Sequence, residues 1–456
     1  MIMIKRVPLL LPLNRPQYVP SSETLISALA WEVLRSDEGY SGSSGRRYLA
    51  TASKDGDTTA GQTRPSDGDL LIGFAQALHK GGLAGEEGHH VLVAEGVLNS
   101  IAGVRPTKAK SQAASPMTPG LALLQDTVGM TGLKNPVNYA SILETMFLLG
   151  SADGGKGPSM AQRWLRAAYR RKESDPLLQI IDDAFIDAYG SHSEKNQTLP
   201  PEDLAGLLPN SPFGWLHDAW VKLTSNDWVD ALPPRVWVDW ATTVLRMGMA
   251  FGFLWEAERY RMMVQLAAGG AGDPTHPLPE PVELLPWPAS YLPVSTRSIR
   301  PAMRRRIDEG GQLRILLAEE INNRQDGSGV WVKSEEFLRR AEEALNDPSR
   351  PSALKNVYET VFYSLVRRDA SDHYGLLVRR GPNYTLVQPG TEWAAMIAGL
   401  SADGPGKSTY VGRIMGELAR LGLRPPLPEL VKLLEAAGLA RGSADADHGV
   451  RVDTPY

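Results

Sequence analysis

Arginines gather at three places in the second half of the chain, and arginine is the side chain best shaped to hold phosphate groups. The first run is Arg304, Arg305 and Arg306, with Arg297 and Arg300 shortly upstream. Arg367 and Arg368 form a second pair, and Arg379 and Arg380 form a third. Clustered cations of this kind are candidates for local contact with a nucleic-acid backbone. The alternative, that they form an ordinary solvated face, stays open.

Other groupings point less clearly to chemistry. Residues 404–409, GPGKST, are similar to the end of a phosphate-binding loop, but Ser401 stands where that pattern needs a glycine. Residues 151–156, SADGGK, give an equally weak signal. His89 and His90 are adjacent, and adjacent side chains on a strand point to opposite faces, so they do not predict a shared metal ion. We predict no catalytic residue, no cofactor and no metal.

Composition limits the classes of protein that the chain can belong to. It has 456 residues and no cysteine, which excludes disulfides, thiolate nucleophiles, iron–sulfur clusters and zinc sites that need sulfur. Its formal net charge of −4 excludes a globally basic nucleic-acid coat. Any contact with nucleic acid must therefore be local.

Two apolar stretches raise the question of export or membrane insertion. Residues 1–13 contain Pro8 and Pro12, and no signal-peptidase cleavage pattern follows them. Residues 236–255 approach the length of a membrane span but contain Asp239 and Arg246, which are costly in lipid, so they predict a buried helix. We expect a cytoplasmic protein without a membrane segment.

The first half of the chain predicts two domains. Residues 1–150 read as an irregular α/β domain with helices over 24–34 and 70–78, a short strand over 91–94, and a mobile insertion over 38–69 that is rich in Gly, Ser, Thr and Asp. Residues 151–268 read as a helical domain, with Ser159 capping one helix and a second helix over 176–189. A proline-rich linker over 269–301 follows.

Six of the tryptophans lie close together in this helical domain, at positions 215, 220, 228, 237, 240 and 255. Tryptophan clusters can form an aromatic platform for bases or for a partner protein. Here Trp237, Trp240, Val244, Met247 and Phe251 recur at helical spacing after Pro233 and Pro234, which suit a helix start. This spacing favours a tryptophan-rich core.

After the linker the order of elements becomes informative. Residues 302–400 predict a helix over 311–322, a short strand over 330–332, helices over 334–345 and 353–368, and a hairpin with strands over 374–380 and 384–387. This order resembles the winged helix-turn-helix superfamily. The resemblance implies that the third helix is a recognition helix and that Arg379 and Arg380 lie at the neck of the wing, where cations meet phosphates or a minor groove. The connection over 346–352 is longer than the tight turn of that family.

Residues 401–456 resemble the same superfamily less completely. Helices are expected over 410–421 and 427–437, with a wing that ends at 450–452. The expected reading helix exposes Glu429, Lys432 and Glu435, and the wing tip contains Asp445 and Asp447. A phosphate backbone would be repelled by this surface, so we expect the module to contact a protein partner.

The predicted fold class is therefore mainly α with small β elements, in a multidomain chain that ends in tandem winged-helix-like modules. We predict a non-catalytic DNA-binding or DNA-sensing subunit of a bacterial multi-protein system, with anti-phage defence as the expected setting. Protein subunits would bind the tryptophan-rich and C-terminal regions. The predicted DNA-binding residues are Arg304, Arg305, Arg306, Lys355, Asn356, Thr360, Ser364, Arg367, Arg368, Arg379 and Arg380. Two alternatives stay open: a protein–protein scaffold, and an enzyme with a site in the N-terminal domain.

Overall fold

A computed structural model describes residues 22–36, 68–83, 89–101, 114–123, 137–189, 191–269, 282–323, 335–346, 355–367, 372–440 and 449–456. The fold is mainly helical, with three small antiparallel sheets of two strands each in the described residues, which confirms the predicted fold class. The predicted insertion over 38–69 lies outside the described residues except for its last two positions, which begin a helix. No helix in the described part of the chain is long and apolar enough to cross a membrane.

The N-terminal part is a layer of helices. Its elements are α2 (Ser22–Val33), β1 (Leu34–Ser36), α3 (Gly68–Lys80), α4 (His90–Ser100), α5 (Pro119–Leu123), α7 (Tyr139–Gly150), α8 (Met160–Ser174), α9 (Pro176–Tyr189) and β2 (His192–Glu194). β1 pairs with β2, and Phe74 of α3 stacks on Phe185 of α9 at 4.4 Å between ring centroids. The predicted strand over 91–94 is wrong, because these residues lie inside α4, which buries Ala94, Val97 and Leu98 at helical spacing.

Local signals explain where several of these helices begin. Ser159 precedes α8 and forms a capping box with Gln162, in which each side chain bonds the other residue's backbone. Glu144 of α7 also accepts hydrogen bonds from the first amides of α8, Met160 N at 3.0 Å and Ala161 N at 2.8 Å. Burial of this carboxyl group raises its pKa, and these hydrogen bonds offset part of that rise. The predicted cap at Ser159 and the predicted helix over 176–189 are both confirmed.

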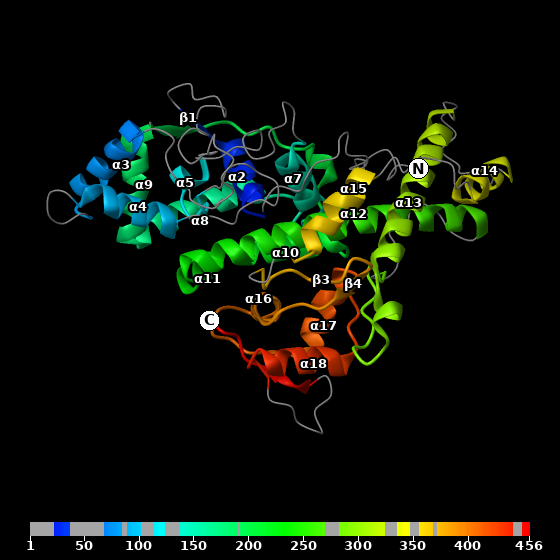
Figure 1. Ribbon diagram of the computed structural model, residues 1–456. Helices are drawn as coiled ribbons and strands as arrows, with labels where there is room; N and C mark the ends of the chain where they lie inside the picture. Colours follow the sequence, from blue (N-terminus) through cyan, green and yellow to red (C-terminus); the bar gives the residue numbers. More distant parts are fainter. Residues whose placement is uncertain are drawn as a thin grey trace.

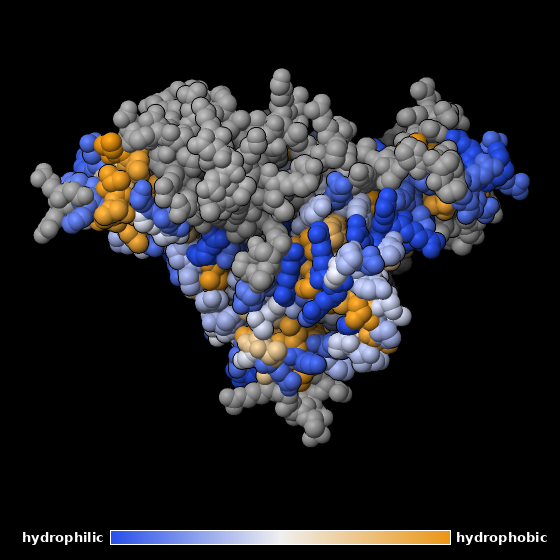
Figure 2. Space-filling model, viewed as in Figure 1, coloured by the Kyte–Doolittle hydropathy of each residue, from blue (hydrophilic) through white to orange (hydrophobic). Residues whose placement is uncertain are grey.

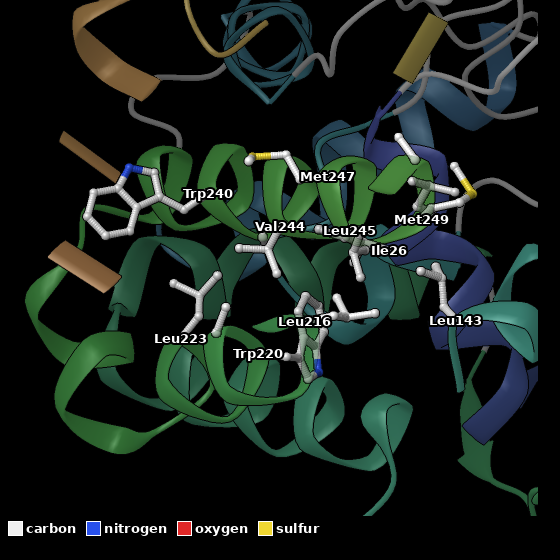
Figure 3. Close-up of a cluster of buried hydrophobic side chains, with 14 of the residues drawn as sticks. Ile26, Leu143, Leu216, Trp220, Leu223, Trp240, Val244, Leu245, Met247 and Met249 are labelled. Carbon is white, nitrogen blue, oxygen red and sulfur yellow. The ribbon is translucent and has the colours of Figure 1, made fainter. Parts of the chain in front are cut away.

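The long helix α12 (Pro234–Gly269) runs across the molecule, with the N-terminal helices on one side and the elements from residue 391 onward on the other (Figure 1). It packs against α10 (Pro212–Leu223), and α11 (Asn226–Ala231) connects the two. All six tryptophans of this region are buried, with exposed fractions from 0% to 6%. Figure 3 shows Trp220 beside Leu216 between the helices and Trp240 on α12 at the edge of the same cluster. The predicted core is confirmed, and an aromatic platform made by these indoles is excluded.

Two predicted domain boundaries fall inside packed regions. α7, before residue 150, packs closely on α10, and Gly150 has no room for a β-carbon beside the Phe213 carbonyl. Residues 282–293 of the predicted linker lie on the C-terminal elements: Leu284 N donates to Gly422 O at 2.8 Å, and Trp287 meets Trp393 edge to face at 6.0 Å. Around Leu284, Leu285 and Trp287 the predicted linker is therefore packed chain, whereas residues 290–296 are exposed.

The next elements carry most of the predicted DNA-binding residues. They are η3 (Val294–Arg297), α13 (Arg300–Asn323), α14 (Glu335–Asn346), α15 (Lys355–Leu365), β3 (Leu377–Arg380) and β4 (Tyr384–Val387). α13 and α15 both pack on α12, and β3 pairs with β4 through a turn at which Gly381 has a φ of 66°. The predicted strand over 330–332 lies outside the described residues.

The last unit begins before the predicted boundary at residue 401. α16 (Thr391–Ser401) packs against α17 (Val411–Arg420) and α18 (Leu427–Ala436). β5 (Thr409–Tyr410) precedes α17 and pairs with β6 (Arg451–Val452) near the end of the chain, and Ala440 bridges Val452 on the other side. Residues 391–440 and 449–456 thus form one small helical unit closed by a short sheet.

Candidate nucleic-acid interface

The start of α13, the outer side of α15 and the β3–β4 hairpin meet at one place on the surface. Two hydrogen bonds fix the chain before α13 to β4: Ile299 N donates to Thr385 O at 3.0 Å, and Thr385 N donates to Ser298 Oγ at 3.3 Å. A bridge between Val366 and Leu377 joins the end of α15 to β3. Side chains that lie far apart in the sequence are thereby brought together.

Aromatic rings of α15 form the floor of this place. Tyr358 and Phe362 are one helical turn apart and stack with their centroids 5.9 Å apart and their planes 15° apart. Tyr363 meets Phe362 edge to face at 5.4 Å and is 36% exposed. Burial raises the pKa of the Tyr358 hydroxyl, although the Arg300 guanidinium beside it favours the ionised form.

Three guanidinium groups lie over these rings. Arg300 is 5.4 Å from the Phe362 centroid and donates from Nε to the Tyr358 hydroxyl at 2.8 Å. Arg379 is 5.0 Å from Phe362 and 5.7 Å from Tyr363, and Arg304 is 5.9 Å from Tyr358. Stacking on a ring leaves the edge of a guanidinium, which carries its N–H donors, available to another group. We call this set the arginine–aromatic surface: Arg300, Arg304, Tyr358, Phe362, Tyr363 and Arg379.

The surface is hollowed and mainly basic. A cavity of about 260 Å³ lies between Arg300, Arg379, the three aromatic residues and the hairpin turn at Gly381 and Pro382, with Glu359 as the one carboxylate in its lining. In Figure 2 strongly hydrophilic side chains gather over the region where α15, α13 and the hairpin face the viewer. Among the described residues neither Arg300 nor Arg379 has a carboxylate partner. These two cations differ in this from Arg304, Arg305 and Arg306, each of which has a carboxylate partner.

The predicted arginines divide into two groups. Arg304 and Arg379 belong to the surface, and Arg305 is exposed nearby on α13 but pairs with Glu309 at 2.5 Å. Arg380, next to Arg379, bonds the Gln388 side chain at 3.0 Å. Arg306 points inward and pairs with Glu258 at 2.7 Å while it also bonds Leu284 O.

Arg367 also has a structural position. Its Nε donates to Gly375 O at 3.4 Å and its Nη2 to Gln388 O at 3.2 Å, so it fixes the chain around the hairpin. Arg306 and Arg367 therefore each use part of their guanidinium donors inside the fold, which makes them weaker candidates for DNA contact than Arg379. Lys355 and Asn356 lie in α15, but their side chains, like all of Arg368, lie outside what the structure describes.

The prediction that α15 exposes Thr360 and Ser364 is wrong. Their exposed fractions are 0% and 2%, because this side of α15 packs on α12. The Thr360 hydroxyl lies beside the hydroxyl of Tyr139, whose burial raises its pKa to about 12. Arg246 of α12, itself buried, donates to Ser364 O at 2.7 Å and pairs with Asp372 at 3.2 Å. α15 cannot enter a DNA groove with this face while the fold is intact.

Sequence patterns missed the aromatic part of the surface. Tyr358 and Phe362 fall on the apolar stripe of their helix, which predicts core, and the structure does bury most of each ring. The signal that could have found them is an i, i+4 aromatic pair in the same module as several arginines. Comparison of the chain with protein-family models, with curated proteins and with solved structures finds no match.

Proposed function

We propose that the chain is a non-catalytic nucleic-acid-binding protein that holds the phosphate backbone of DNA on the arginine–aromatic surface. The observation that carries the proposal is the pair of guanidinium groups of Arg300 and Arg379, stacked on Phe362 with no carboxylate partner in the described residues. An arginine held by a ring loses less side-chain freedom when it binds, and its N–H edge matches phosphate oxygens.

The same geometry favours binding that is independent of base sequence. Groove reading needs an element that can enter the groove and place side chains at base edges. On α15, Thr360 and Ser364 are instead buried where the helix packs on α12. Arginines at the surface can still contact phosphates, which fix position but carry no sequence information. We therefore expect similar affinities for duplexes of unrelated sequence.

The C-terminal unit supports a second part of the proposal, a contact with a protein partner. The order α16, β5, α17, α18, β6, with β5 paired to β6, is similar to the element order of a winged helix. Its α18 carries Glu429, which accepts from Ser290 N at 2.8 Å and from Ser290 Oγ at 2.7 Å. A helix with this charge, already in contact with residues 282–293, is poorly suited to phosphate, so we assign the unit to protein contacts.

The assignment to a bacterial defence system and to the cytoplasm stays a prediction, because none of these contacts bears on it.

Fluorescence anisotropy with labelled random-sequence DNA duplexes tests the proposal. At about 50 mM salt the wild type should bind, and Arg300→Ala with Arg379→Ala should weaken binding roughly tenfold or more. Arg170→Ala is the control. Arg170 lies on α8, outside the arginine–aromatic surface, and pairs with Asp230. Its removal should leave DNA affinity unchanged. Equal affinity of the double variant and the wild type would refute the proposal, as would a strong preference for one duplex sequence.

A further inference from the structure

A second cavity, of about 110 Å³, lies between α7, α8, α10 and the loop over 151–159. This volume is roughly ten times what one water molecule needs, so a molecule of several non-hydrogen atoms fits. Its walls are mainly apolar, and Phe147, Leu148, Leu199 and Pro200 provide them. None of its lining residues belongs to the arginine–aromatic surface.

Two nitrogen-bearing side chains lie against one wall of this cavity. The guanidinium of Arg163 is 6.0 Å from the centroid of the Phe147 ring, and among the described residues only its Nε is hydrogen-bonded, to Pro158 O at 3.2 Å. The imidazole of His217 is 4.5 Å from the same ring. Its Nδ1 lies 3.1 Å from Asp218 Oδ1, and within the described residues its Nε2 makes no hydrogen bond.

Two carboxylates lie in the same lining. Asp153 is fixed because its Oδ1 accepts from Ser151 Oγ at 2.8 Å and from Gly155 N at 3.0 Å, and these bonds lower its pKa. Glu202 is exposed, and its carboxylate has no hydrogen bond to any described residue. The third acid, Glu144, is already committed to the amides of α8 and to Gln197 Nε2.

We infer that this cavity binds a small zwitterion, an α-amino acid with an aliphatic side chain. Arg163 would hold the ligand carboxylate through its free Nη donors. Asp153 and Glu202 would accept from the ammonium group, and the unused Nε2 of His217 can accept there too when the ring is neutral. A purely anionic ligand would be repelled by the two carboxylates, and a purely cationic ligand would be repelled by Arg163. An aliphatic side chain suits the apolar walls.

Isothermal titration calorimetry on the full chain tests this inference with three probes. L-leucine carries both charged groups, 4-methylpentanoate lacks the ammonium group and 3-methylbutylamine lacks the carboxylate. We expect leucine to bind and each half-ligand to bind about tenfold more weakly or worse. No detectable leucine binding would overturn the inference, and so would equal affinity for leucine and either half-ligand.

Variants identify the groups that bind the ligand. Arg163→Gln should weaken the binding of leucine and of 4-methylpentanoate. Arg170→Gln, on the same helix but paired with Asp230, should change neither affinity. Arg163 is half-buried, so unfolding of its variant is checked by thermal melting. Glu202 is exposed, so Glu202→Gln is a second variant that should not affect folding. It should weaken the binding of leucine and of 3-methylbutylamine and leave the binding of 4-methylpentanoate unchanged. Unchanged leucine affinity in a folded Arg163→Gln or in Glu202→Gln would contradict the assigned roles.

Discussion

The guanidinium of Arg379, on β3, lies 5.0 Å from the centroid of the Phe362 ring on α15. Arg300, at the start of α13, lies 5.4 Å from the same ring. One buried aromatic side chain therefore positions two cations that come from different elements. Because like charges repel, two unpaired guanidinium groups at one ring are an arrangement that an anion would stabilise.

Removing the ring should weaken DNA binding without removing a charge. Phe362→Leu takes away the face on which both arginines stack, so we expect a loss of about three- to tenfold in affinity for a duplex. The control Phe362→Tyr keeps the ring and should keep the affinity. Anisotropy at low salt measures both variants. An unchanged affinity in Phe362→Leu would show that the ring does not position the arginines.

A substitution of Thr360 distinguishes binding of the phosphate backbone at the arginine–aromatic surface from insertion of α15 into a DNA groove. Thr360→Val replaces a buried hydroxyl that has no well-formed hydrogen bond to a described residue, so stability should change by less than about 1 kcal/mol. We expect DNA affinity to stay within about twofold of the wild type. A loss comparable to that of Arg379→Ala would mean that α15 exposes this face to DNA.

Asp239 should make stability depend on pH. Burial on α12 raises its pKa to about 6, and the Arg235 guanidinium, 3.5 Å away, offsets only part of that rise. The folded state therefore holds a proton that the unfolded state releases near pH 4, so this contribution to stability is lost as the pH rises from about 4 to 6. The loss amounts to about 3 kcal/mol, at about 1.4 kcal/mol for each pH unit.

Asp239→Asn removes the titrating group and should flatten this dependence. Urea unfolding of both proteins at about pH 4.5 and 7.5 measures it, since the difference between the proteins isolates one residue. The variant should lose less stability than the wild type over this interval. Parallel losses in the two proteins would contradict the assignment to Asp239.

Elements with a strong local signal were predictable from sequence. The helix over 176–189 has a proline start and a clear apolar stripe, and the strand over 384–387 follows a glycine turn, so local chemistry decides both. The tryptophans at helical spacing likewise predicted a core. The prediction of a strand over 91–94 was wrong because four residues can suit a strand or a helix equally. The buried positions Ala94, Val97 and Leu98 show the helical period only over a longer window.

The site was less predictable because its members depend on distant partners. Arg304, Arg305 and Arg306 are consecutive, but successive residues of a helix point about 100° apart, so a run of three cannot act as one group. The structure exposes the first two and turns Arg306 toward Glu258. Thr360 and Ser364 are small polar residues that suit either water or a helix interface. Their neighbours, Tyr139 and Arg246, are far away in the sequence.

The salt dependence of DNA affinity tests the central claim most directly. Each phosphate contact releases counterions, so the slope of log K against log salt measures the number of contacts. Between about 50 and 200 mM salt, Arg300→Ala with Arg379→Ala should have a slope shallower than the wild type by about two, and Arg170→Ala should keep the wild-type slope. Identical slopes for the wild type and the double variant, or wild-type binding that does not respond to salt, would contradict the arginine–aromatic surface as the phosphate site.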